Sequence, residues 1–474
     1  MNTAKRVAKN TLVMVFGEIS AKILTVGYTI LLARHLLVEG FGVLSFFLAL
    51  TGMLRLFTDI GFFELTIREV ARDKTVAKKF FSNVLLLKSI TVVAIFGAFF
   101  LYLFFADYPQ EVELLACLLG LAVAIDSLAS IFRSILQGFE EMLYISLGKI
   151  LRSAVLLSGT VVLIIFNFGL VEFGVLYLIA NTISFTFLVS ALVKKVMFEK
   201  ISFEFDKRFW KTIFREGIPF WAATAFVVIL NDTDKIMLYA MVGERAVGFY
   251  SAAYRMVFAL NFLPLMFIAA LYPVTSRLFT KSANSLVKTS EIAYKFVLVI
   301  GLFVVVILSG FSEIIVSTIF GKEFSSSAEP LKILAWSQLF LYLNVVLGNL
   351  FRSADMQIIK TYQVAAAATL NVFLNFLLIP IWSFVGASFA TLMARSFSFV
   401  FLGLVAIRHF DFSRALLLQS MAVVLLSALF VYASILSKNS LILVVGLITI
   451  LVFLYTKIFD DSDRRILIKL IKME

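Results

Sequence analysis

The chain has very little of the residues from which soluble enzymes build catalytic and metal sites. Its 474 residues include one cysteine, Cys117, and two histidines, His35 and His409. A single cysteine excludes an intramolecular disulfide, and so few Cys and His side chains argue against a dedicated metal site. We therefore expect no metal and no cofactor.

Charge is scarce as well, at 15% of residues, and the familiar catalytic motifs are missing from the sequence. There is no Gly-rich loop of the Walker type, which argues against ATP hydrolysis by this chain, and neither HExxH nor GxSxG occurs. The loops expected on the outer side are short. These absences argue against an integral membrane enzyme, so we expect a protein that is not an enzyme.

Long apolar segments take up nearly the whole chain. The hydrophobic fraction is 61%, the mean hydropathy is +1.01 and Phe alone supplies 52 residues. One helical crossing of a bilayer needs roughly 20 apolar residues. Segments of this size begin near residues 11, 41, 81, 114, 145, 171, 220, 247, 292, 333, 362, 385, 416 and 441. The sequence predicts an all-α polytopic membrane protein with about 14 transmembrane helices.

The basic residues collect in every second loop between these segments, beginning with Lys5, Arg6 and Lys9 at the N-terminus. Cytoplasmic loops of membrane proteins carry such an excess of Lys and Arg. We therefore expect a multi-pass protein of the cell (cytoplasmic) membrane with both termini inside. The net charge of +12 is then topological and does not indicate nucleic-acid binding.

An internal repeat divides the predicted helices into two similar halves. Residues 33–45 resemble residues 239–251 when Gly42 is aligned with Gly248, and residues 138–142 resemble residues 352–356. Two parallel six-helix halves with a site between them are a transporter pattern. The predicted parts are an N-terminal lobe (1–197), an interfacial amphipathic linker (198–216), a C-terminal lobe (217–410), spans thirteen and fourteen (411–460), and a cytoplasmic amphipathic tail (461–474).

Ionisable residues deep in a membrane are costly and are functional candidates by default. The sequence spacing lets some of them pair within one helix: Glu18 with Lys22, Arg55 with Asp59, and Asp232 with Lys235. Lys88 and Lys235 could instead extend their ammonium groups to an interface. Arg255 and Arg395 have no acidic residue within one helical turn, so they need a partner from another helix, from water or from a ligand.

Four of these residues predict a cationic cavity. They are Lys22, Arg55, Arg255 and Arg395. The natural guest of such a cavity is an anion, and the planar guanidinium group of arginine suits phosphate because it donates paired hydrogen bonds.

Several segments resemble the polysaccharide-synthesis flippases of the O-antigen type, within the multidrug/oligosaccharidyl-lipid/polysaccharide exporter superfamily. In the first half these are residues 31–36 (LLARHL), 40–42 (GFG) and 59–61 (DIG). In the second half they are residues 234–238 (DKIML) and 247–254 (VGFYSAAY). The sequence departs from the family at residues 37–39 (LVE), where a Gly-containing turn is usual.

The resemblance implies a function. A flippase of this family transfers a polyprenyl-(pyro)phosphate-linked oligosaccharide from the cytoplasmic to the outer leaflet by alternating access between two lobes. Lipid-linked oligosaccharide, membrane lipids and polysaccharide-assembly enzymes are then the expected partners. The resemblance also implies coupling to a Na⁺ or H⁺ gradient, for which the candidate acids are Glu18, Asp59, Asp126, Asp232 and Asp234.

Two alternatives stay open at this point. The first is an ion-coupled multidrug or cation antiporter of the same superfamily, which needs an acidic cavity; here the candidate acids compete with at least four deep cations. The second is an integral enzyme or a non-transporting scaffold of an envelope-glycan complex. The short outer loops argue against the enzyme, and a scaffold leaves the deep arginines unexplained.

Overall fold

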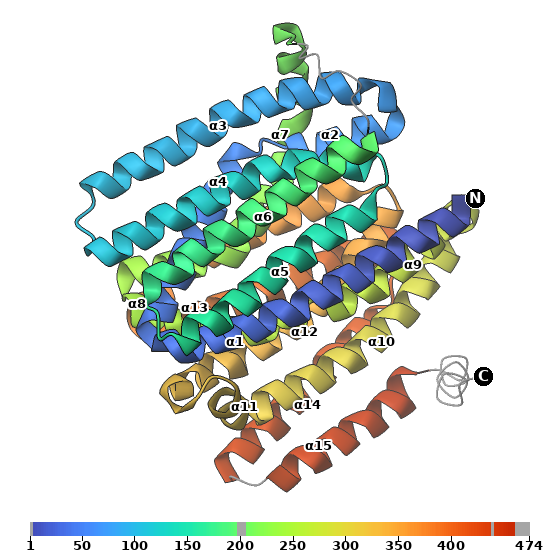
Figure 1. Ribbon diagram of the computed structural model, residues 1–474. Coiled ribbons are helices and arrows are strands. Elements are labelled where there is room, and N and C mark those ends of the chain that lie inside the picture. Colours follow the sequence, from blue (N-terminus) through green and yellow to red (C-terminus); the bar gives the residue numbers. More distant parts are fainter. Residues whose placement is uncertain (1–2, 197–204, 438–439, 460–474) are drawn as a thin grey trace. The chain divides into compact units, whose positions relative to one another are not determined.

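The computed structural model describes residues 3–196, 205–437 and 440–459, and the regular structure in these ranges is helical throughout (Figure 1). The chain divides by its internal contacts into two compact units, Met1–Gly248 and Phe249–Glu474. The helices of the first unit are α1 (Thr3–Thr58), α2 (Phe62–Arg72), the short η1 (Lys74–Val76), α3 (Ala77–Phe105), α4 (Gln110–Gly138), α5 (Met142–Ile165), α6 (Leu170–Val196) and α7 (Lys207–Met241).

The second unit begins within α8. Its helices are α8 (Glu244–Ala259), α9 (Phe262–Lys281), α10 (Ala283–Gly310), α11 (Ser312–Ile319), the short η2 (Lys322–Ser327), α12 (Ala328–Ser353), α13 (Gln357–Phe410), α14 (Arg414–Ser437), α15 (Ser440–Phe453) and the π-helical turn η3 (Leu454–Ile458).

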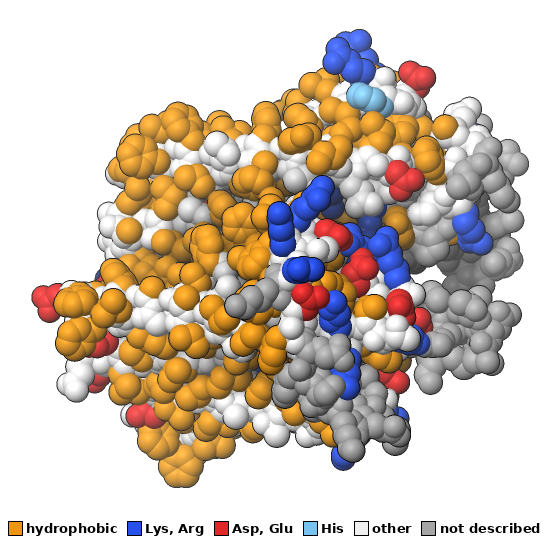
Figure 2. Space-filling view, turned by 90° about the horizontal axis from the view of Figure 1, so that it is seen from above, with side chains coloured by type: hydrophobic (Ala, Val, Ile, Leu, Met, Phe, Trp, Pro, Cys, Tyr) orange, Lys and Arg blue, Asp and Glu red, His pale blue; other side chains and the backbone are white. Residues whose placement is uncertain are grey.

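The number of membrane-spanning segments is roughly consistent with the expected fourteen. Eleven helices among the described residues are long and apolar enough to cross a membrane. Two of them, α1 and α13, contain a sharp break, at Leu37 and at Ser383, so each makes two crossings. With α15, which coincides with the last expected segment, the total is fourteen. Broad apolar areas cover the face shown in Figure 2, and the charged side chains gather in restricted parts of it.

In the first unit the long helices lie side by side, with α4 against α3 and α6, and α5 against α1 and α6 (Figure 1). Lipid is as apolar as the helix surfaces, so close packing rather than the hydrophobic effect holds such helices together. Small residues permit it: the Cα of Gly174 faces Leu115 and Leu118 on α4, where a Cβ would come within 3.1 Å of either side chain.

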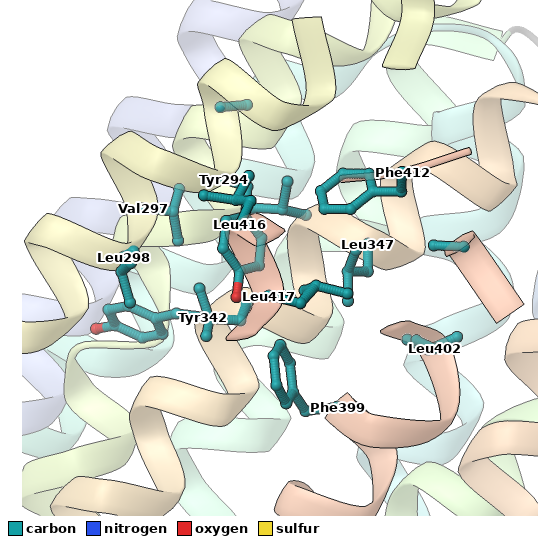
Figure 3. Close-up of a cluster of buried hydrophobic side chains, with 14 of the residues drawn as sticks. Tyr294, Val297, Leu298, Tyr342, Leu347, Phe399, Leu402, Phe412, Leu416 and Leu417 are labelled. Carbon is teal, nitrogen blue, oxygen red and sulfur yellow. The ribbon is translucent and has the colours of Figure 1, made fainter. Parts of the chain in front are cut away.

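The second unit has a hydrophobic core formed mainly by α10, α12, α13 and α14, with several aromatic rings among Leu and Val side chains (Figure 3). The ring of Tyr294 packs against Phe412 with the ring planes near perpendicular, and its hydroxyl lies 2.8 Å from the Ser420 hydroxyl. The Tyr342 hydroxyl donates to the Leu260 carbonyl oxygen at 2.7 Å. Both buried tyrosines thus satisfy their polar atoms, as groups away from water must.

One pair of turns has the same backbone feature at positions that the predicted repeat makes equivalent. Leu37 separates the two crossings of α1 with a φ of 57°, and Gly243 separates α7 from α8 with a φ of 112°. Aligning Gly42 with Gly248 places Leu37 opposite Gly243. The departure of residues 37–39 from the family pattern therefore puts a leucine where a left-handed backbone favours glycine.

The second match of the repeat is also present, but shifted by one residue. Glu140 and Asp355 have φ values of 63° and 58°. The N–H of Glu141 donates to the Leu136 carbonyl and that of Met356 to the Phe351 carbonyl, both at 2.9 Å, a C-terminal helix turn that also ends α5 at Asn167. The left-handed residue of this turn is Glu140 in the first unit and Asp355 in the second, whereas the expected alignment sets Glu140 against Ala354.

The contact-based boundary falls after α7, whereas the predicted lobe boundary falls before it. Residues 207–216 of the predicted interfacial linker form the first turns of α7, which continues through Pro219 to Met241. The first part of that linker, through residue 204, and the predicted tail at 461–474 lie outside the described residues.

Candidate functional site

The second crossing of the first unit is a broken helix. It ends at Thr58, and α2 resumes at Phe62 after Gly61, whose φ is 73°. Side chains replace the lost helical hydrogen bonds: the Phe63 N–H donates to Asp59 Oδ1 at 3.1 Å, and Trp221 Nε1 donates to the Leu56 carbonyl at 3.1 Å. Transporters form substrate and ion sites at such discontinuous helices.

The corresponding crossing of the second unit is broken as well. Helix α8 ends at Ala259, and α9 begins at Phe262. Tyr342 caps the break by donating to the Leu260 carbonyl, and Gln338 Nε2 donates to Asn261 Oδ1. In each unit, therefore, polar side chains form hydrogen bonds at the break in this crossing.

At the first break, Lys88 and Asp59 form a buried ion pair. The Lys88 side chain is 0% exposed, and its ammonium group donates to Asp59 Oδ2 and to the Ser130 hydroxyl. The expectation that Lys88 extends to an interface is therefore wrong, because a carboxylate and a hydroxyl on neighbouring segments hold its charge inside the unit. Asp59 thus pairs with Lys88 and not, as expected, with Arg55.

Arg55 pairs instead with Asp126 on α4, at 2.6 Å. Asp126 also accepts from Arg133 Nη1 at 2.8 Å, and Arg133 Nη2 donates to the Asp126 carbonyl at 3.0 Å. One carboxylate thus faces two guanidinium groups. The Arg55 side chain remains 39% exposed, so it keeps donors for a further partner. Nearby on α5, Arg152 donates to Asn181 Oδ1 at 2.7 Å.

The remaining predicted residues of the first unit lie on α1 and α7. Lys149 pairs with Glu18 at 2.9 Å, and both charges act on Lys22. Lys235 pairs with Asp232 at 2.6 Å, as the spacing of three residues predicted. Asp234 is fully buried.

Arg395 is held in the second unit by neutral groups. Its side chain is 4% exposed, and Nη1 lies 3.2 Å from both the Ser337 hydroxyl and Gln338 Oε1. Asn344 Nδ2 donates to the Arg395 carbonyl at 3.1 Å. Among the described residues, no carboxylate pairs with this guanidinium. A buried arginine without a counter-charge is an unusual and costly arrangement.

Arg255 is half-buried on α8, four residues before the break. The described part of the second unit offers it neither a hydrogen bond nor an ion pair. Of the four predicted cations, Lys22 and Arg55 thus lie in the first unit, and Arg255 and Arg395 in the second.

Sequence reasoning missed the neutral partners, such as Gln338 and Asn261, and both arginines that pair with Asp126. The seven-residue spacing of Asp126 and Arg133 places both on one face of α4, so this pair could have been found. Within the described ranges, no group of three or more His, Cys, Asp or Glu side chains is placed to hold a metal ion.

The first half of the chain and part of the second match a family model described as polysaccharide biosynthesis protein, over residues 7–279. The chain belongs to this family. Two curated relatives are similar over more than half of the chain. An uncharacterised membrane protein of Methanocaldococcus jannaschii is 25% identical over 58% of this chain, although the match spans only 56% of that protein. A putative O-antigen transporter of Shigella flexneri is 24% identical over 73% of this chain and 82% of that protein.

Solved structures share the fold of this chain. The lipid II flippase MurJ, in an inward closed conformation, superposes with a TM-score of 0.72 at 14% identity, over 94% of this chain and 99% of that one. An inward-facing multidrug resistance transporter of the MATE family, in the MOP superfamily, gives 0.66 at 17% identity, over 84% and 96%. The chain thus has the fold of a polytopic membrane protein, which it shares with solved structures of transporters.

Proposed function

We propose that this protein moves a polyprenyl-(pyro)phosphate-linked oligosaccharide from the cytoplasmic to the outer leaflet by alternating access, and that cations bind the phosphate head. Arg395 carries this proposal. It is buried among neutral hydrogen-bond partners, and nothing described in its unit neutralises its charge. A phosphate group supplies both the missing charge and the oxygen acceptors that a guanidinium prefers.

The ion pairs of the first unit favour an anion over a cation as the transported group. Glu18, Asp59, Asp126 and Asp232 each pair with a lysine or arginine. A cationic drug would have to displace the lysine or arginine from one of these acids. An anion could bind directly to Arg55, which is half-exposed and oriented by its ion pair with Asp126. Lys22, Arg55, Arg255 and Arg395 are therefore the residues that we assign to the phosphate head.

The family and the relatives support the same class of substrate. The Shigella relative is named a putative O-antigen transporter, and the similar solved structure is a lipid II flippase. We extend the proposal to a location in the cell membrane with both termini in the cytoplasm, which the alternation of basic loops supports. Polysaccharide-assembly enzymes would supply and consume the lipid-linked glycan.

The test is reconstitution into liposomes with a fluorescent polyprenyl-diphosphate oligosaccharide, followed by its accessibility to a quencher added outside. We expect transfer with the wild-type protein and its loss in Arg395→Gln. Arg408→Gln is the matched control, because Arg408 is exposed near the end of the same helix. Transfer at the wild-type rate in Arg395→Gln contradicts the anion site, and gradient-driven uptake of a cationic dye would identify a drug antiporter instead.

A further inference from the structure

The first turns of α7 carry three exposed basic residues in a row, which we call the basic stripe: Arg208, Lys211 and Arg215. Their spacings of three and four residues place them on one face of the helix. In the part of the chain that the structure describes, none of the three side chains has an ion pair or a hydrogen bond. Thr212, on the same face, is exposed as well. The stripe therefore faces away from the first unit.

The acidic residues of the same segment point toward the unit. Residues 205–218 contain two acids, Asp206 and Glu216. Asp206 pairs with Lys79 on α3 at 3.0 Å, and Glu216 pairs with Arg68 on α2. Both acids are thus engaged by basic residues of other helices, and neither neutralises the stripe. This separation of charge leaves the outer face of the segment cationic.

The inner face of these turns is fixed to the first unit. Ile213 is fully buried, and the Phe209 ring packs against Phe80 of α3 with the ring planes near perpendicular. Trp210 Nε1 donates to Asn83 Oδ1, also on α3, at 2.8 Å. Figure 1 shows the first turns of α7 extending from the unit at the end where α3 begins. The cations of the stripe therefore have a defined place on the unit.

The stripe lies at the membrane surface because α7 is longer than one crossing needs. Its spanning segment Arg208–Met241 has 34 residues, which is about 50 Å at 1.5 Å per residue, whereas the hydrocarbon core is about 30 Å thick. The first turns therefore extend into the headgroup region. Exposed apolar side chains border the stripe at both ends, with Phe205 56% and Ile218 50% exposed. The alternation of basic loops places this end in the cytoplasm.

We propose that the basic stripe binds the headgroups of anionic phospholipids in the cytoplasmic leaflet. Basic residues beside the start of a crossing are attracted to anionic lipid, and no carboxylate on this face repels the phosphate. The bordering Phe205 and Ile218 contact the acyl chains. A lipid surface fits the stripe better than a soluble acidic partner, because the stripe runs along a helix that itself enters the bilayer.

Binding at the stripe acts on the break in the second crossing. Arg215 is adjacent to Glu216, whose pair with Arg68 joins α7 to α2. Gly217 follows, and it packs so closely on the break that a Cβ there would lie 2.3 Å from the Ile60 carbonyl oxygen. A lipid held by Arg215 therefore steadies the part of α7 against which the broken helix rests.

Fluorescence quenching in vesicles without any substrate tests the lipid site. A fluorophore is attached at Thr212→Cys in a Cys117→Ser background, since Cys117 is the one native cysteine. Vesicles of equal parts phosphatidylglycerol and phosphatidylcholine carry bromine on one lipid or on the other, so their composition and charge are the same. We expect stronger quenching when bromine is on phosphatidylglycerol, and loss of this difference at high salt.

Neutralising the stripe provides the second measurement. The double variant Lys211→Gln, Arg215→Gln should lower the preference for phosphatidylglycerol by about fivefold for each cation removed. The double variant Arg408→Gln, Arg414→Gln is the matched control, because it removes the same charge from two exposed cations of the second unit and should keep the preference.

Two results would overturn the proposal. One is equal quenching by the two brominated lipids in the chain with an intact stripe, and the other is an unchanged preference after Lys211 and Arg215 are neutralised. Either would assign the stripe to a soluble acidic partner instead. Because the assay contains no lipid-linked oligosaccharide, its outcome does not depend on whether the protein flips one.

Discussion

Gly42 and Gly248 approach each other so closely that neither position has room for a side chain. A Cβ on Gly42 would lie 1.9 Å from the Glu244 carbonyl oxygen, and one on Gly248 would lie 2.1 Å from the Val38 carbonyl oxygen. These two glycines are the equivalent residues of the internal repeat. Within the first unit, the start of the second crossing in α1 therefore packs against the first turns of α8. A second close contact joins Gly61 at the break to Gly217 in α7.

Replacing Gly42 with alanine should destabilise the protein. The added methyl group meets backbone atoms, which cannot rotate away as a side chain would, and overpacking of this kind costs about 1–3 kcal/mol. Chemical denaturation in detergent measures the loss. Gly52→Ala is the matched control on the same helix, because nothing lies within 4 Å of the added Cβ. Equal stability of the two variants would contradict the packing observed at Gly42.

Leu37→Gly should stabilise the protein. Leu37 has a φ of 57° and a ψ of −171°, a region that is essentially restricted to glycine and costs other residues about 1–3 kcal/mol. Part of the gain is offset by the greater freedom of glycine in the unfolded chain. The reciprocal change, Gly243→Leu, should destabilise by introducing the same strain at the repeat-related position. The melting temperatures of both variants in one detergent provide the test, and a lower value for Leu37→Gly would count against the strain.

Two buried cations should respond differently to neutralisation. Lys88→Gln removes one member of an ion pair and leaves Asp59 unpaired, which typically costs about 3–5 kcal/mol. Arg395→Gln removes a charge that has only neutral partners, so stability should stay the same or rise while flipping is lost. Denaturation midpoints measured beside transport rates separate the two effects. A large loss of stability in Arg395→Gln would reveal a counter-charge.

Acidification should loosen the first turn of α7. Asp206 Oδ1 accepts from the backbone N–H groups of Arg208 and Phe209, and Oδ2 accepts from Lys79 Nζ at 3.0 Å. The hydrogen bond from Lys79 and those from the backbone hold the pKa of Asp206 below its usual value. Its contribution is therefore complete above the unfolded value of about 3.9 and is lost as the pH falls through the lower folded pKa.

Hydrogen exchange of the first amides of α7, measured as a function of pH, follows this loss. Asp206→Asn is the matched control, because it keeps an oxygen acceptor at the cap position but cannot titrate. The wild type should lose protection on acidification and the variant should not. Loss of protection to the same extent in both would assign the change to another group.

The fold was largely accessible from the sequence because hydropathy determines where a chain can cross a bilayer. The segments and the repeat follow from that pattern and from a few turn residues such as Gly243. The exact positions of the breaks within α1 and α13 were harder to predict. Leu37 and Ser383 have a left-handed backbone, but leucine and serine rarely adopt that conformation.

The site was accessible only in part. Spacing within one helix correctly indicated the pair of Asp232 and Lys235, because neighbours on a helix face are fixed by its period. Pairs between helices, such as Asp59 with Lys88, depend on how each helix is rotated about its axis, and hydropathy alone does not determine that rotation. The partners of Arg395 are uncharged, so a search of the sequence for opposite charges does not find them.

The uncompensated charge of Arg395 has an electrical consequence for the proposed cycle. A bound phosphate head neutralises much of the binding site, so the loaded protein moves little net charge when it reorients. After release, the empty site is positive. In a cell with a negative interior, returning a positive charge inward releases about 2.3 kcal/mol per charge for each 100 mV. The membrane voltage would therefore act mainly on the return of the empty transporter, resetting it for the next lipid.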